Sequence, residues 1–199
     1  MKRALCLMLL LTLLVPLALA VPKTKTKAKG KAKAKTAKVV APANPAYPEE
    51  KLGLKLGLQC YTAKKMTLVE TMDLAQRIGM KHLELYSKQK VCKDKSWITA
   101  PGMSKEAIAF IRAELKKRGL SVIGYGVINT ADKKTLAKAF ATAKALGCDT
   151  VVVEGDAKVM GYVDALCTKN KMRAAIHNHP KPSRYWDPKY AIKQTKKNI

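Results

Sequence analysis

The sequence predicts an α/β protein whose strands are parallel. Five short apolar runs are predicted strands, at residues 55–62, 82–86, 121–127, 150–154 and 173–177. Segments with helical periodicity separate them, and three of these segments end in a glycine directly before the next run, at Gly79, Gly119 and Gly147. Strands that alternate with helices pair in parallel through right-handed crossovers. Both a doubly wound sheet and a closed (β/α) barrel fit this pattern.

The predicted helices carry their own start signals. Thr67 precedes the first helix, and Glu70 three residues later completes a capping box. Ser104 is the predicted N-cap of the second helix. The predicted helices span 68–78, 104–119, 130 or 132 to 147, and 158–168.

Polar and aromatic side chains gather where the predicted strands end. No G-x-G-x-x-G loop follows the first strand, so a dinucleotide-binding fold loses its main support. In a barrel, catalytic groups lie at the carboxyl ends of the strands. The residues at these ends are Tyr61, Glu84, Tyr86, Tyr125, Asn129, Glu154, Asp156, His177 and His179.

The end of the fifth predicted strand holds two of the three histidines. Alternate residues of a strand share a face, so His177 and His179 are predicted to point one way and Asn178 the other. The position of these two histidines at the end of a strand favours a chemical role for them. The pattern also fits one core histidine and one solvent-facing loop histidine.

The first 48 residues differ in composition from the rest. Residues 1–20 begin with Lys2 and Arg3, continue as an apolar run and end in Ala18-Leu19-Ala20, which predicts a signal peptide cleaved after Ala20. A membrane anchor would need a longer uninterrupted apolar run, of about 20 residues. Residues 21–48 are rich in Lys, Ala and Pro and predict a disordered linker. We therefore expect a secreted or periplasmic protein without a transmembrane helix after cleavage, whose folded domain spans 49–199.

The chain is strongly basic, with 39 Lys and Arg against 14 Asp and Glu and a formal net charge of +25. Eight of the lysines lie at 23–38, in a Lys/Ala repeat without aromatic residues. Such a repeat offers no surface on which bases stack, so we expect no specific nucleic-acid binding. We expect this segment to contact anionic polymers electrostatically.

Cysteine usage indicates buried thiols. Cys6 lies in the predicted signal peptide, and the spacings of the other four are not those of zinc sites. Three disulfide pairings are possible in an oxidising compartment, but the predicted strand and helix positions favour small buried thiols. These four residues are Cys60, Cys92, Cys148 and Cys167.

Five motifs carry a family resemblance. They are LGLQCY at 56–61, HLELY at 82–86, GYGV at 124–127, IHNHP at 176–180 and YWDP at 185–188. In this order and spacing they resemble the sugar phosphate isomerase/epimerase family, and its exported members most closely. The resemblance covers residues 53–190. It implies part of a xylose-isomerase-like (β/α)8 TIM barrel, with about five βα units present.

The resemblance also implies a divalent-metal site, at which acidic residues move a proton between carbons of a sugar or keto-sugar. It implies Glu84 and Glu154 as catalytic residues and His177 as a metal ligand. In many relatives a glutamate stands at the position of His177, and imidazole favours Mn, Co, Zn or Fe over Mg. The implied substrate contacts are Tyr61, Tyr86, His179, Tyr185 and Trp186. Some of these residues have a plainer alternative. In it, Glu84 pairs with a lysine, and Tyr185 and Trp186 cap the barrel rim.

A complete barrel has eight strands, and relatives take further metal ligands from strands six to eight. We therefore expect the N-terminal part of a barrel, as a fragment or a truncated product, marginally stable and inactive by itself. The main alternative is a non-catalytic remnant or carbohydrate-binding module, tethered to anionic polymers by its basic tail. A DNA-cleaving relative is disfavoured because the predicted strand 121–127 has no histidine.

Overall fold

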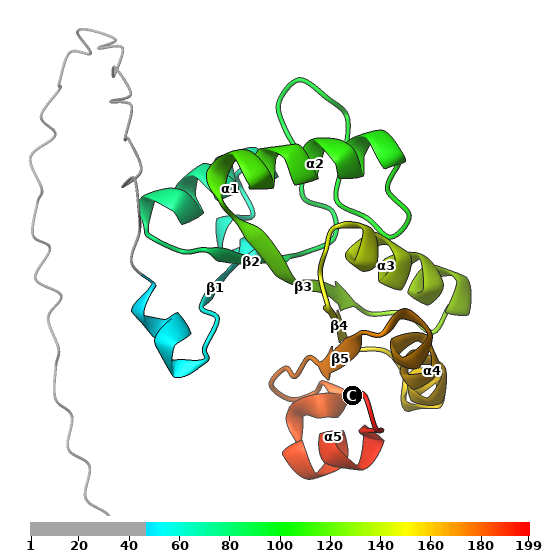
Figure 1. The fold of residues 1–199 in the computed structure, drawn as a ribbon. Helices are drawn as coiled ribbons and strands as arrows, with labels where there is room; N and C mark the ends of the chain where they lie inside the picture. Colours follow the sequence, from blue (N-terminus) through cyan, green and yellow to red (C-terminus); the bar gives the residue numbers. More distant parts are fainter. Residues whose placement is uncertain (1–46) are drawn as a thin grey trace, which may run out of the picture. The chain divides into compact units, whose positions relative to one another are not determined.

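The computed structural model describes residues 47–199 (Figure 1). The predicted signal peptide and nearly all of the predicted linker lie outside these residues. Among the described residues, no helix combines the length and apolar character needed to cross a membrane.

Five parallel strands form one sheet, and their order in space is their order in the sequence. They are β1 (Gly57–Gln59), β2 (His82–Leu85), β3 (Ser121–Ile128), β4 (Thr150–Val153) and β5 (Arg173–Ile176). A doubly wound sheet reverses its strand order, whereas a (β/α) barrel adds each new strand beside the last. The sheet therefore has the order of a barrel.

A helix follows each strand. The α-helices are α1 (Leu68–Arg77), α2 (Lys105–Arg118), α3 (Lys133–Ala145), α4 (Met160–Asn170) and α5 (Pro188–Gln194). Short 3-10 helices are η1 (Pro48–Leu52), η2 (Cys60–Ala63), η3 (Ala157–Val159) and η4 (Arg184–Trp186). Helices α1 to α4 lie along the outer side of the curved sheet (Figure 1).

The two faces of the sheet have different roles. Leu83, Leu85 and Val153 are fully buried in the hydrophobic core, which the helices share. Because side chains alternate along a strand, Glu84 and Val152 point to the opposite, inner face. The inner face is the one that carries the candidate site.

The first strand is shorter than the sequence predicts. Residues 60–62 were expected to continue it, but they form the 3-10 turn η2. The Gln59 side chain starts this turn by accepting a hydrogen bond from the Tyr61 N–H at 2.6 Å. The turn buries Cys60 and Ala63, and it leaves Tyr61 exposed at the end of the sheet. The prediction of a strand at 60–62 is therefore wrong.

The predicted capping box at the start of α1 is confirmed. The Thr67 N–H donates to Glu70 Oε2 at 2.9 Å, and the Glu70 N–H donates to Thr67 Oγ1 at 3.2 Å. The Lys93 ammonium lies 2.7 Å from Glu70 Oε1. The hydrogen bond from Lys93, together with those from Thr67, lowers the pKa of Glu70 to about 2.

Replacing Thr67 with alanine is expected to lower the free energy of unfolding by about 1 kcal/mol, since it leaves the Glu70 N–H without its cap. Urea unfolding followed by circular dichroism measures this. Glu70→Gln serves as the comparison, because its amide oxygen still accepts from Thr67 while the charge facing Lys93 is lost. An unchanged urea midpoint for Thr67→Ala would contradict the assignment.

The cysteines of the described part are buried free thiols, as the sequence predicts. Burial raises the pKa of the Cys60 thiol to about 12, and the pKa values of Cys148 and Cys167 to about 11. Because the thiolate is the reactive form, these side chains are inert core residues.

Candidate functional site

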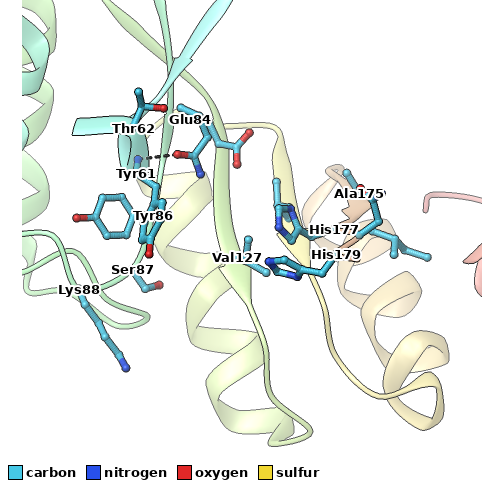
Figure 2. A pocket seen from close by; sticks show the side chains of 14 residues that line it. Tyr61, Thr62, Glu84, Tyr86, Ser87, Lys88, Val127, Ala175, His177 and His179 are labelled. Atoms are coloured by element: carbon cyan, nitrogen blue, oxygen red, sulfur yellow. Dashed lines mark hydrogen bonds between the residues drawn. The ribbon is translucent and has the colours of Figure 1, made fainter. Parts of the chain in front are cut away.

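A pocket of about 800 Å³ lies on the inner face of the sheet, where the strands end (Figure 2). Residues from β1 to β5 and from the segments that follow them contribute to its wall. Five of the eight predicted site residues line it: Tyr61, Glu84, Tyr86, His177 and His179. The structure therefore brings together residues that are up to 118 positions apart in the sequence.

The two histidines lie against each other at the end of β5. Their ring centroids are 4.5 Å apart and the rings meet at 74°. The His177 backbone N–H donates to the Val153 carbonyl at 2.8 Å, which extends the β4–β5 pairing and fixes where His177 stands. Figure 2 shows both rings on the same side of the chain, as the strand alternation predicts.

Glu154 lies behind His179 and is not part of the pocket wall. Its Oε1 is 2.9 Å from His179 Nδ1 and accepts a hydrogen bond from Ser183 Oγ at 3.0 Å. Burial works to raise the pKa of Glu154, but the bonds from His179 and Ser183 outweigh it and hold this pKa below its ordinary value. Because an ionised carboxylate only accepts, the proton of a neutral His179 lies on Nδ1 and Nε2 is the free nitrogen. Glu154 thus orients His179.

Glu154→Gln is expected to make the thermal midpoint less sensitive to acid. The Glu154 pKa is depressed in the folded state, so its contribution to stability is present above its ordinary value of 4.5 and is lost as the pH falls through the folded pKa. Glutamine has no such charge to lose. Thermal unfolding of both proteins between pH 6 and pH 3 measures the difference. Parallel curves over this range would show that the Glu154–His179 pair does not contribute.

Glu84 points from the middle of the sheet into the pocket. It stands beside Gly124 of β3, where a Cβ atom would lie only 3.0 Å from Glu84 Cγ, so the glycine gives the carboxylate its space. Within residues 47–199, no Lys, Arg or His nitrogen lies within 4.0 Å of the Glu84 oxygens. The alternative of a carboxylate paired with a lysine is therefore not found in this part of the chain, and Glu84 is available to a ligand.

Tyr61 and Tyr86 form an aromatic wall on the side of the pocket opposite the histidines (Figure 2). Their ring centroids are 5.2 Å apart and the rings meet edge to face, at 86°. The Lys64 ammonium lies 4.7 Å from the centre of the Tyr61 ring. Tyr61, which is exposed, therefore offers the pocket an aromatic ring with a polar edge.

Tyr185 and Trp186 do not line this pocket. Tyr185 is buried in the core, and its hydroxyl donates to the Gly155 carbonyl at 2.7 Å. Trp186 lines a separate pocket of about 230 Å³, and Lys181 Nζ lies 4.0 Å from the centre of its ring. Neither aromatic residue therefore contributes to the wall of the pocket that holds Glu84 and the histidines.

Sequence reasoning missed Lys88 and Ser183. Lys88 lines the pocket from the β2–α2 connection, beyond the predicted strand end. Ser183 reaches Glu154 only because the segment after β5 folds back toward β4. Neither residue lies in a motif, so the sequence carried no signal for either.

The side chains of the described part do not make a metal site by themselves. Across residues 47–199, no three His, Cys, Asp or Glu side chains converge closely enough to hold an ion. Protein metal sites use three or more such ligands, or fewer with an open position. His179 Nδ1 faces Glu154 and its Nε2 is free, so His177, His179 and Glu84 are each a separate candidate ligand. The predicted role of His177 as a metal ligand stays a prediction.

Comparison with known proteins finds similarity to solved structures. No protein-family model matches the chain, and no curated protein does. Among solved structures, the chain is similar to an uncharacterised protein from Parabacteroides distasonis, with 34% identity and a TM-score of 0.61. It is also similar to a sugar phosphate isomerase/epimerase from the same organism, with 13% identity and a TM-score of 0.51. A D-psicose 3-epimerase, crystallised in the presence of D-fructose, matches with 14% identity and a TM-score of 0.50.

These matches cover 63%, 71% and 73% of this chain, in that order. The chain spans 53% of the first protein, 64% of the second and 61% of the third. At such low identity, the second and third show the fold alone. Together with the sequential parallel sheet, they confirm the predicted α/β fold, part of a (β/α)8 TIM barrel.

Proposed function

We propose that this domain forms the sugar-binding part of an isomerase or epimerase site. The observation that carries the proposal is the unpaired Glu84 carboxylate, which shares one pocket with an oriented imidazole pair at the carboxyl ends of parallel strands. The aromatic wall of Tyr61 and Tyr86 supports a sugar as ligand. The structural relatives named as sugar isomerases and epimerases support the same substrate class.

The chemistry follows from the two kinds of group in the pocket. In an epimerisation or ketose isomerisation, a base removes the proton from a carbon next to a carbonyl, and an acid returns a proton to a different face or carbon. The Glu84 carboxylate removes the proton, and the carboxylic acid that results returns it to the neighbouring carbon in an isomerisation. His179, held by Glu154, donates a hydrogen bond to the carbonyl oxygen when protonated and stabilises the charge that develops there.

A second candidate is carbohydrate binding without catalysis. It is favoured by the exposure of Tyr61, whose surface is 53% accessible, and by the small number of converging acidic and imidazole groups in residues 47–199. Both candidates require a sugar in the same pocket. They differ only in whether a carbon-bound proton is exchanged.

Proton exchange distinguishes the two candidates. The full chain is incubated in D₂O with D-fructose or D-psicose, and binding is followed by saturation-transfer NMR. The isomerase proposal expects loss of the proton signal from a carbon next to the carbonyl, at a rate above that of heat-denatured protein. Binding without exchange supports the second candidate. Failure of both sugars to bind contradicts the proposed function.

A further inference from the structure

A second cluster of polar side chains lies at the amino ends of the strands, away from the pocket. His82 is the first residue of β2 and Ser121 the first of β3, and the two are partners in the pairing of these strands. Their side chains therefore point to the same face of the sheet. His82 shares that face with Glu84, two residues further along β2. The cluster thus lies on the inner face, at the end opposite the pocket.

The His82 ring joins Ser121 to Glu50. Its Nδ1 lies 2.7 Å from Ser121 Oγ, and its Nε2 lies 3.3 Å from Glu50 Oε1. His82 is buried, with 5% of its surface accessible, whereas Ser121 is exposed. A hydroxyl that faces solvent therefore contacts a shielded imidazole, and a carboxylate holds the other nitrogen of that imidazole.

Lys81 keeps Glu50 in place and ionised. Glu50 lies in η1, and both of its carboxylate oxygens accept hydrogen bonds from Lys81 Nζ, at 2.8 and 3.0 Å. These bonds are the main reason that the pKa of Glu50 lies below its ordinary value; burial opposes them and the contact with His82 adds to them. Because an ionised carboxylate only accepts, the proton of a neutral His82 lies on Nε2. Nδ1 is then the basic nitrogen, and it accepts the hydrogen bond of the Ser121 hydroxyl.

The order of these groups is that of an activated nucleophile, in which a hydroxyl contacts a base and a third group orients the base. The Ser121 hydroxyl is not needed to attach η1 to the sheet, because Glu50 reaches Lys81 and His82 directly. A purely structural role of the cluster therefore leaves the contact between Ser121 and His82 unexplained.

We infer that Ser121 is a nucleophilic site that takes an acyl group from an activated ester, with His82 as its base and Glu50 as the positioning residue. The Ser121 oxygen attacks the carbonyl carbon of the ester and forms a new ester bond, while its proton passes to His82 Nδ1. The bond from that carbon to the leaving oxygen breaks, and His82 gives the proton to the leaving alcohol. The sugar pocket takes no part in this reaction.

The test uses p-nitrophenyl acetate as the acyl donor. The full chain is incubated with it at neutral pH, and mass spectrometry of a proteolytic digest locates the acetylated residues and follows them in time. We expect Ser121 to be acetylated about 10² to 10⁴ times faster than Ser96, the range that a positioned base contributes. Ser96 is the internal comparison because it is exposed and, within the described part of the chain, has no hydrogen bond to a histidine.

Two variants separate the base from the residue that positions it. His82→Gln is expected to lower the Ser121 rate to that of Ser96, and Glu50→Gln to lower it by about tenfold or more. Glu49→Gln is the matched control, because it removes a charge from the same helix without touching His82. Circular dichroism checks the fold of each variant. If the buried His82 does not tolerate replacement, Glu50→Gln decides, because Glu50 is exposed.

Acetylation of Ser121 at the rate of Ser96 in the wild-type chain overturns the inference and leaves the cluster as an attachment of η1. A Ser121 rate that Glu50→Gln leaves unchanged also overturns it. Neither result bears on the proposed function, because the reaction does not use the pocket.

Discussion

Gly126→Ala is expected to prevent the domain from folding, or to destabilise it by about 3 kcal/mol or more. A Cβ atom at this position would lie 2.3 Å from the Val152 carbonyl oxygen and 2.7 Å from the Val152 Cβ. The nearest atom belongs to the backbone of the neighbouring strand, so no side-chain rotation relieves the clash. Strands β3 and β4 would have to separate, and the pairing at the centre of the sheet would be lost.

Urea unfolding followed by circular dichroism tests this expectation, with Gly161→Ala as the control. Gly161 lies in α4 with open space around its Cβ position, so alanine there is expected to leave stability unchanged or to raise it by up to about 1 kcal/mol. A Gly126→Ala protein with the wild-type midpoint would show that the two strands do not approach this closely. Loss of the pairing between β3 and β4 would also disturb the candidate site, because Val127 and Val152 line the pocket.

The regular elements were predictable because their signals are local. The Thr67 capping box and the Ser104 N-cap stand directly before α1 and α2, and the helices end at the residues that the glycines predict. The choice between a barrel and a doubly wound sheet depends on which strands become neighbours. Pairing between strands is not encoded in any one segment, so it required the structure.

The site was predictable to the extent that strand geometry fixes it. Glu84 lies in β2 and His177 directly follows β5, and strand alternation places both side chains on the inner face. The partnership of Glu154 with His179 and Ser183 depends on how the segment after β5 folds back. The same segment takes Tyr185 into the core instead of to the pocket. Loop conformations of this kind have no periodic signal.

Glu84→Gln is expected to slow proton exchange on a bound ketose by about 10² to 10⁴, the range that a positioned general base contributes. Glutamine has nearly the shape of glutamate and fits the space beside Gly124, but its amide does not accept the proton. Sugar affinity should change little, because the aromatic wall and the histidines remain. Exchange measured by NMR in D₂O, together with affinity measured on the same samples, separates these two effects.

Glu106→Gln is the matched control for this experiment. Glu106 is an exposed carboxylate in the first turn of α2 and does not line the pocket, so its loss should leave both exchange and binding unchanged. Exchange that stays within a few-fold of wild type in Glu84→Gln would exclude Glu84 as the base. His177 and His179, whose Nε2 is left free by its contact with Glu154, would then be the remaining candidate bases in the described pocket.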